Sequence, residues 1–251
     1  MIMIARTSRH PLGRLLGIAT AATALAATAW IVATRRQSRQ ASRLHRVLVE
    51  LLLNALSSGD PLTARHSRRV ANLADALAAK LALSREKHAT LRVAALLHDM
   101  GKIEDDLFPI VHSPHPLSEG ERGRINRHPS ESAHILEPLE PFHPGIRRIV
   151  SSHHENWNGS GYPCGLAREE IPLAARVISV ADVFDAMTQP RSYRGPVAVN
   201  KVFAEIQRGA GTRFDPHIVE MLEDPEVRAR WVDIAYAGHE EEAQPQREAS
   251  G

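Results

Sequence analysis

The pattern of apolar and polar positions along the chain predicts a protein that is almost entirely helical. Apolar residues recur every three or four positions over residues 41–57 and again over residues 63–81, where His66 falls on the apolar face. A continuous apolar run at residues 93–97 then leads directly into His98-Asp99. No segment shows a persuasive strand alternation, and no internal repeat is present. The expected fold class is therefore all-α.

Helix boundaries are indicated by capping residues. Thr63 is the expected N-cap of the helix that carries His66, and Ser118 with Glu121 forms a capping-box pattern for a later helix. Residues 173–187 predict a helix in which Asp182 and Asp185 share a neighbouring face. Residues 236–251 are rich in Glu, Gln, Ala and Ser, which predicts a disordered tail.

The N-terminal part contains residues 15–34, an uncharged stretch of 20 residues with arginines on both sides. As a helix it would be about 30 Å long, enough to cross the hydrocarbon core of a membrane. We expect a short tail (residues 1–14), one transmembrane helix, and a domain over residues 35–235. The heavier arginine cluster follows the span and favours a cytoplasmic domain. A cleaved signal peptide and a buried soluble helix are the alternatives.

Composition narrows the class of function. The formal net charge is +2, so no global basic field indicates nucleic-acid binding. The single cysteine, Cys164, excludes an intramolecular disulfide. Aromatic residues make up 4%, so the core must rest on aliphatic side chains. Eight of the 14 histidines lie between positions 98 and 154, and this clustering favours a site.

Imidazoles and carboxylates follow one another at predicted helix ends. The candidates for metal ligands are His66, His98, Asp99, His128, His153, His154 and Asp182. Taken singly, His66 could be a core histidine and the 153–154 pair could be solvated. Asp182 is harder to explain in this way, because a buried carboxylate is costly unless it is paired or bound to a metal.

The chemistry of these groups indicates a phosphohydrolase. Imidazoles and carboxylates without thiolates suit iron or manganese better than zinc. Two divalent transition-metal ions a few Å apart could share a bridging hydroxide and clamp the oxygens of a phosphodiester. Lys102, which follows His98-Asp99 closely, could stabilise charge on the phosphate.

The order of these motifs resembles the HD-GYP family, a branch of the HD-domain metal phosphohydrolases. Its members are typically bacterial phosphodiesterases that cleave the second messenger cyclic di-GMP. The similar stretches are residues 63–70 (TARHSRRV), 96–103 (LLHDMGKI), 127–129 (RHP), 153–155 (HHE), 158–163 (NGSGYP), 181–188 (ADVFDAMT), 191–194 (RSYR) and 211–216 (GTRFDP). The resemblance covers roughly residues 45–225.

The resemblance implies an HD-type bundle of about seven helices with a dinuclear metal site made of the seven candidate ligands. It implies that Asp99 bridges the two ions, and that Lys102 contacts the scissile phosphate or protonates the leaving oxygen. The residues that would hold or orient the nucleotide are Tyr162, Asp185, Arg191 and Arg194. Glu155 would fix a ligating imidazole. The protein would sit in the bacterial inner membrane with its catalytic domain in the cytoplasm.

The chain departs from the family pattern at three positions. Some members carry a Glu that helps to hold a third metal where this chain has Leu62. Asn158 replaces a usual Asp, and Ser113 replaces a usual Lys. Two alternatives therefore remain. One is a non-catalytic cyclic di-GMP receptor or protein-interaction module, and the other is a phosphohydrolase of another nucleotide, including another cyclic dinucleotide. A homodimer or a signalling-protein partner is a further expectation.

Overall fold

We describe residues 30, 32, 36, 43–44, 47–103, 107–111, 113, 115–190 and 195–243 of a computed structural model. The chain divides into two compact units, Met1–Leu48 and Val49–Gly251. The expected transmembrane helix at residues 15–34 lies outside the described residues, apart from Trp30 and Val32. Of the helices that are described, none combines the length and the apolar character needed to cross a membrane.

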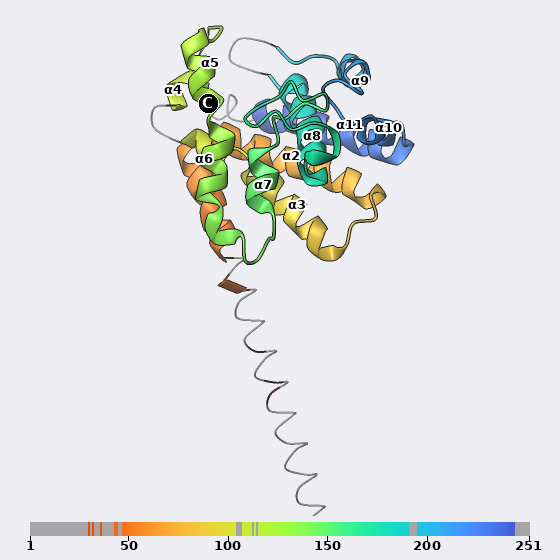
Figure 1. The fold of residues 1–251 in the computed structure, drawn as a ribbon. Coiled ribbons are helices and arrows are strands. Elements are labelled where there is room, and N and C mark those ends of the chain that lie inside the picture. Colours follow the sequence, from red (N-terminus) through yellow and green to blue (C-terminus); the bar gives the residue numbers. More distant parts are fainter. Residues whose placement is uncertain are drawn as a thin grey trace, which may run out of the picture. The chain divides into compact units, whose positions relative to one another are not determined.

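The second unit is built from helices joined by loops (Figure 1). Residues 47–59 are helical. The helices that follow are α2 (Pro61–Lys80), α3 (Arg85–Leu97), η1 (Met100–Ile103), α4 (Phe108–Val111), α5 (Glu119–Ile125), α6 (His128–Ile135), η2 (Glu137–Leu139), α7 (Ile146–Ser151), η3 (Arg168–Glu170), α8 (Leu173–Thr188), α9 (Val199–Arg208), α10 (Pro216–Met221) and α11 (Pro225–Ala243). In the described part of the chain, extended pairing is limited to two isolated bridges, Asn158–Ala167 and Ala210–Phe214.

The all-α prediction is confirmed, but the expected count of about seven helices is too low. The described residues contain ten α-helices from α2 to α11, besides residues 47–59. The difference comes from short elements such as α4 and α10, which have four and six residues. An element of one turn cannot repeat an apolar period, so the sequence pattern does not reveal it.

Helix α2 packs against α3, α8 and α11 and carries His66. Its start differs from the prediction, because Asp60 rather than Thr63 is the N-cap and Pro61 occupies the first turn. The Asp60 side chain accepts hydrogen bonds from the backbone N–H groups of Leu62 and Thr63. A cap of this kind stabilises a helix by about 1 kcal/mol. The Asp-Pro pair at residues 60–61 is the sequence signal for it.

Three aromatic side chains pack together where α8, α9 and α11 meet. The ring of Phe184 lies 5.1 Å from that of Phe203 and 4.7 Å from that of Trp231, measured between centroids. Trp231 is fully buried, and its indole N–H donates to the backbone carbonyl of Leu73 on α2. This cluster fixes α11 and α8 to the helix that carries His66.

The predicted disordered tail begins too early. Helix α11 continues to Ala243, so residues 236–243 are helical, and residues 244–251 lie outside the described residues. Gly238 is buried, and a Cβ built on it would lie 2.8 Å from Cδ of Arg69. Tyr236 and Ala237 are exposed, whereas Gly238 packs against Arg69.

Helix α5 is more exposed than α2 or α8. Ser118 and Glu121 form the predicted capping box at the start of α5. Within the described chain, none of the seven residues of α5 is buried.

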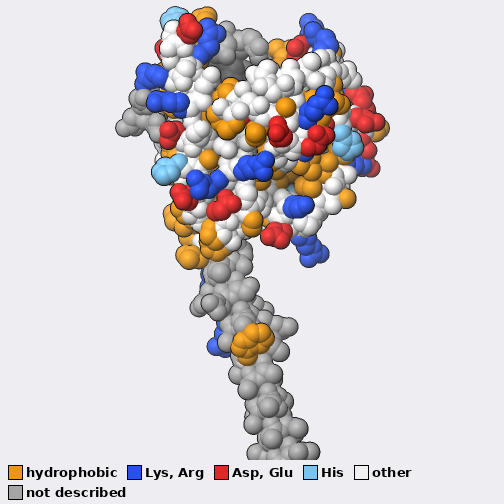
Figure 2. Space-filling view, viewed as in Figure 1, with side chains coloured by type: hydrophobic (Ala, Val, Ile, Leu, Met, Phe, Trp, Pro, Cys, Tyr) orange, Lys and Arg blue, Asp and Glu red, His pale blue; other side chains and the backbone are white. Residues whose placement is uncertain are grey.

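On the face shown in Figure 2, basic and acidic side chains are interspersed, in keeping with the balanced net charge.

Candidate metal centre

Asp99 is buried just after α3, and its two carboxylate oxygens lie near different imidazoles. Oδ2 lies 3.4 Å from Nε2 of His98 and 3.7 Å from Nε2 of His66. Oδ1 lies 3.2 Å from Nε2 of His128 and 3.9 Å from Nε2 of His153. A carboxylate placed in this way can bridge two cations.

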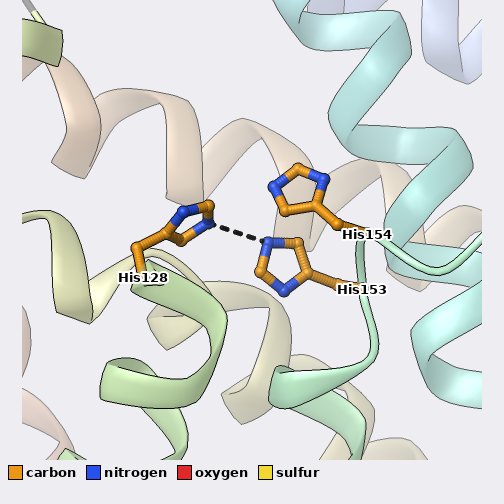
Figure 3. Close-up of side chains that lie close together, drawn as sticks. All are labelled: His128, His153 and His154. Carbon is orange, nitrogen blue, oxygen red and sulfur yellow. Dashed lines mark hydrogen bonds between the residues drawn. The ribbon is translucent and has the colours of Figure 1, made fainter. Parts of the chain in front are cut away.

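The potential ligands form two groups around this carboxylate. In one group, ligand atoms of His66, His98 and Asp99 all lie within 4.8 Å of one another. In the other, the same holds for His128, His153 and His154, which point toward one another in Figure 3. Asp182 adds a carboxylate beside the first group, with Oδ1 3.1 Å from Nε2 of His66.

Three of the imidazoles are oriented by the backbone. Nδ1 of His98, His128 and His153 each lies 2.6–2.8 Å from the carbonyl oxygen three residues earlier, in Ala95, Ile125 and Val150. A carbonyl only accepts, so Nδ1 carries the proton and Nε2 presents its lone pair toward Asp99. This is the tautomer that a metal-ligating histidine needs.

His66 is oriented by side chains instead. Its Nδ1–H donates to Oδ2 of Asp185 at 2.7 Å. Arg69 donates to the same carboxylate through Nε, 2.7 Å from Oδ1, and through Nη2, 3.1 Å from Oδ2. All three side chains are buried. A carboxylate that orients a ligating imidazole is a common arrangement at metal sites.

Unsatisfied polar atoms show that these residues fit a metal. Among the described residues, Nε2 of His98 and Oδ1 of Asp99 are buried without a hydrogen-bond partner. Buried polar atoms are rarely left in this state, because desolvation without a partner costs about 1–3 kcal/mol. Nε2 of His98 belongs to one group of candidate ligands and Oδ1 of Asp99 faces the other, so the donor set fits divalent metal ions on both sides.

The electrostatics favour the metal-binding forms of His153, His154 and Asp99, whereas they favour the protonated form of His66. Burial lowers the pKa of His154 to about 3, and burial together with the neighbouring imidazoles holds the pKa of His153 well below its usual range. Burial also lowers the pKa of His66, but Asp182 and Asp185 outweigh it and raise this pKa to about 9. Burial opposes ionisation of Asp99, yet His98 and Lys102 keep its pKa well below normal.

Gly101 brings η1 against α6. A Cβ built on Gly101 would lie 2.5 Å from the carbonyl oxygen of His128 and 2.8 Å from the backbone nitrogen of Ser132, so no other residue fits without displacement. The Gly101 N–H donates to the Ser132 hydroxyl. This close approach places Lys102 beside the centre, where its Nζ donates to Oδ2 of Asp99 at 2.7 Å.

The Gly-Tyr-Pro loop folds back on the paired histidines. Tyr162 stacks on His154, with ring centroids 5.0 Å apart, and a Cβ on Gly161 would lie 2.5 Å from Cα of Glu155. Glu155 was expected to fix an imidazole, but its buried carboxylate accepts the backbone N–H groups of Cys164 and Leu166. Glu155 therefore orders the loop.

A pocket of about 460 Å³ reaches the centre. Its lining includes His66, Asp99 and Lys102 on one side and residues of α4, α5 and the segment between them on the other. This volume lies within the range of small-molecule sites. Arg122 and Ile125 belong to this outer wall and were not indicated by the sequence motifs, whereas Ser113, which also lines it, was singled out from the sequence.

The structure brings all seven candidate ligands and Lys102 together. Asp185 was expected to hold or orient the nucleotide; in the structure its two oxygens bind His66 and Arg69, and the residue also lines the pocket. Arg191 and Arg194 lie outside the described residues. Arg69 was missed as a site residue; its position one turn after His66, on a predominantly apolar face, was the available signal.

Curated relatives share this part of the chain. The 3'3'-cGAMP-specific phosphodiesterase 3 of Vibrio cholerae is 38% identical over 162 residues, covering 64% of this chain and 35% of the relative. The cyclic di-GMP phosphodiesterase response regulator RpfG of Xanthomonas campestris is 35% identical, covering 68% and 45%. A cyclic di-GMP phosphodiesterase of Thermotoga maritima is 36% identical, covering 67% and 46%. The chain spans less than half the length of these three relatives.

Solved structures share the fold. A cyclic GMP-AMP specific phosphodiesterase of Vibrio cholerae aligns with a TM-score of 0.55 at 23% identity, covering 76% of this chain and 52% of that one. An HD-GYP-type protein of Bdellovibrio bacteriovorus, Bd1817, aligns with a TM-score of 0.53 at 23% identity, covering 64% and 51%.

A family model described as the HD domain matches residues 50–218, which include every candidate ligand. The match begins close to the boundary of the second structural unit and ends within α10. The motif order, the helical fold and the relatives agree with it, so the resemblance seen in the sequence is confirmed. The chain belongs to the HD domain family, in its HD-GYP branch.

Proposed function

We propose that this chain is a metal-dependent phosphodiesterase that hydrolyses cyclic di-GMP. The observation that carries the proposal is the buried carboxylate of Asp99, whose two oxygens face separate groups of imidazoles. Lys102 contacts the same carboxylate, and both residues line the pocket. The relatives with cyclic dinucleotides in their names support this class of substrate.

The residues would hold two ions. His66, His98 and Asp182 would bind one and His128, His153 and His154 the other, with Asp99 shared between them. Iron or manganese suits this oxygen and nitrogen donor set. Bound ions would supply an activated water as the nucleophile and would neutralise charge on the phosphate oxygens.

Lys102 would act on the substrate. Hydrolysis adds water across one P–O bond, and the ribose oxygen that leaves must receive a proton. The Lys102 ammonium has three protons and donates one of them to Asp99 Oδ2 at 2.7 Å, so others remain for a phosphate oxygen or the leaving oxygen. Its side chain is 19% exposed, which leaves it within reach of a ligand in the pocket.

A second candidate substrate is 3'3'-cGAMP. Three relatives with 34–38% identity carry this specificity in their names. The two cyclic dinucleotides differ in one purine base, so the choice depends on the pocket wall rather than on the metal ligands. Ser113 lies in that wall.

The test is a turnover assay of the purified full-length chain, loaded with Mn²⁺ or Fe²⁺, against both cyclic dinucleotides, with the products identified by mass spectrometry. We expect cyclic di-GMP to be cleaved faster, and the double variant His98→Ala/Asp99→Ala to be inactive and to lose its metal. Faster cleavage of 3'3'-cGAMP would favour the second candidate. Binding of cyclic di-GMP without turnover in the metal-loaded protein would make the chain a receptor.

We also propose that residues 15–34 anchor the chain in the bacterial inner membrane with the catalytic domain in the cytoplasm. The support is the uncharged stretch of 20 residues and its flanking arginines. A reporter that functions only in the cytoplasm, fused after Gly251, should be active and should sediment with membranes. Activity of a periplasmic reporter, or release of a shortened chain, would favour a signal peptide.

A further inference from the structure

We propose that Gly238 on α11 is a positioning residue for the metal centre, acting on His66 through Arg69 and Asp185. The inference rests on the proposed function, because it assigns Gly238 a part in holding one of the two ions. It extends the centre to a helix that carries none of the candidate ligands.

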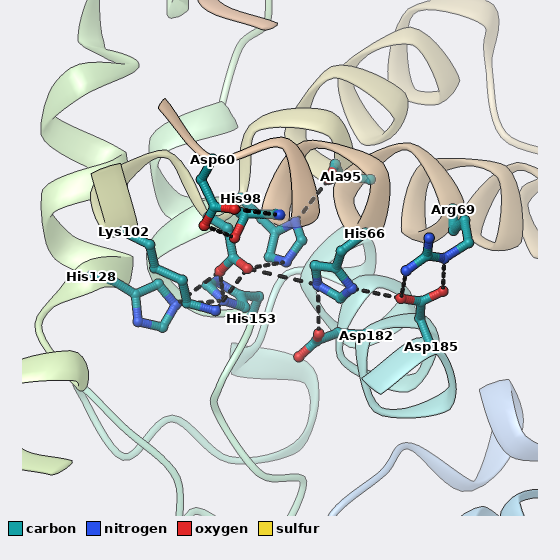
Figure 4. Close-up of polar contacts among 12 residues, drawn as sticks. Asp60, His66, Arg69, Ala95, His98, Lys102, His128, His153, Asp182 and Asp185 are labelled. Carbon is teal, nitrogen blue, oxygen red and sulfur yellow. Dashed lines mark hydrogen bonds and ion pairs between the residues drawn. The ribbon is translucent and has the colours of Figure 1, made fainter. Parts of the chain in front are cut away.

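The first links are hydrogen bonds between buried side chains (Figure 4). Asp185 Oδ2 accepts the Nδ1–H of His66 and so fixes the direction of Nε2. Arg69 holds Asp185 through two of its nitrogens. A guanidinium that binds both oxygens of a carboxylate fixes the orientation of that carboxylate. The position of the Arg69 side chain therefore determines where His66 points.

The last link is a contact that only glycine allows. A Cβ on Gly238 would lie 2.8 Å from Cδ of Arg69 and 2.8 Å from Oε1 of Gln189. Neither neighbour can withdraw freely, because Arg69 is bound to Asp185 and the buried Gln189 donates from Nε2 to the carbonyl of Ala235. A methyl group at position 238 must therefore displace the Arg69 side chain or the helix.

The helix itself is anchored close by. Trp231 lies seven residues before Gly238, two turns earlier on the same side of α11, and its buried indole donates to Leu73. Glycine is a poor helix former, and the φ of Gly238 is not in the left-handed region. The backbone does not require glycine at this position, so the reason for it is the space occupied by Arg69 and Gln189.

The effect should be confined to one side of the centre. His128 and His153 are oriented by carbonyls of their own segments, through Ile125 and Val150. Displacement of Arg69 would rotate His66 and leave these two imidazoles in place. Ion binding at the His66 side should weaken while the other ion stays bound.

The experiment compares the full-length parent, Gly238→Ala and the control Ala237→Val, which adds bulk at an exposed neighbouring position. Mn²⁺ titration of the metal-free proteins should give two ions for the parent and the control. In Gly238→Ala, one ion should bind about 10–100-fold more weakly, as expected when support of a ligand is disturbed. The unfolding temperature should change little, because the helix preference of alanine offsets part of the cost of displacing Arg69.

A second readout needs no metal. The imidazole signals of His66 in ¹H–¹⁵N spectra of the metal-free protein should shift in Gly238→Ala and stay unchanged in Ala237→Val. Adding Gly238→Ala to Asp185→Asn should cause no further loss of ion affinity, because both act on the same link. A parent that binds no Mn²⁺ would contradict the proposed function, and the His66 signals would still test this inference.

Three results would overturn the inference. One is parent-like binding of both ions with unchanged His66 signals in Gly238→Ala. Another is equal weakening of both ions together with a lower unfolding temperature, which would indicate general destabilisation. The third is a loss in the double variant that equals the sum of the two single losses.

Discussion

The imidazoles around Asp99 are oriented by two kinds of contact. His98, His128 and His153 each donate to a carbonyl three residues earlier, whereas His66 donates to Asp185, 119 positions away in the chain. In the first case the local backbone sets the direction of Nε2. In the second case it depends on Asp185 and Arg69, which come from α8 and α2.

This difference determines how each side of the centre responds to mutation. A backbone carbonyl cannot be removed by a side-chain substitution, so the imidazoles of His128 and His153 are changed only by replacing them or moving their helices. His66 can be disturbed by one substitution at a residue that is not among the candidate metal ligands. The predictions below test this asymmetry, from the largest effect to the smallest.

The largest effect is expected at the carboxylate that both sides share. Asp99→Asn keeps the size of the side chain but removes the charge between the two groups, so both ions should be lost and turnover should fall more than about 10³-fold. Metal analysis and turnover with cyclic di-GMP are the measurements. Asp75→Asn, a change at a partly exposed carboxylate that pairs with His88, is the control and should behave like the parent. Retention of both ions would show that Asp99 is not the bridge.

Lys102→Ala should leave metal binding unchanged on both sides of the centre. The side chain contacts Asp99 and lines the pocket, and its proposed action is on the substrate. Turnover should fall about 10²–10³-fold, the usual effect of losing one charge-stabilising group, while two ions stay bound. The exposed Lys87→Ala is the control. A fall in metal content with turnover per bound metal unchanged would assign Lys102 to the centre itself.

Asp185→Asn should weaken ion binding on the His66 side of the centre and leave the other side unchanged. The amide can no longer serve as an anionic acceptor for both His66 and Arg69, so ion affinity at the His66 side should drop about 10–100-fold. The ion bound by His128, His153 and His154 should stay. Mn²⁺ titration distinguishes one weakened ion from two, and equal weakening of both would refute the asymmetry.

Leu62→Glu should add a metal ligand on the His66 side of the centre, whereas Asp185→Asn should disturb one there. Since α2 begins at Pro61, Leu62 and His66 lie four residues apart within one helix and on one face. Leu62 also lines the pocket and is 47% exposed, so a carboxylate there could reach a further ion. We expect metal content to rise towards three per chain, with Leu62→Gln as the uncharged control. Three ions in the parent would contradict the dinuclear assignment.

The residues that could be predicted from the sequence are those whose contacts are local in the chain. His98, Asp99, Lys102 and the 153–154 pair stand in short motifs at helix ends, where composition and spacing are enough to group them. Their orientation is also local, so the grouping in the structure agrees with the grouping in the sequence.

The parts of the site that the sequence did not predict depend on contacts between distant segments. The binding of Asp185 to His66 and Arg69 joins α8 to α2, and nothing in the local sequence of either helix indicates the pairing. The same holds for Gly238, whose polar surroundings predicted a disordered tail although one face packs against Arg69. Glu155 was assigned to an imidazole because of its neighbours, but its partners are N–H groups nine and eleven residues later.

The exposure of α5 bears on how a ligand enters the pocket. Ile125 and Arg122 of α5 line the pocket, yet this helix has no buried residue within the described chain. Segments with few buried contacts have low opening free energies, and their amide hydrogens exchange with solvent early. The opposite wall belongs to α2, whose face is buried against three helices. We therefore expect the α5 wall of the pocket to open by local unfolding more readily than the wall that carries His66.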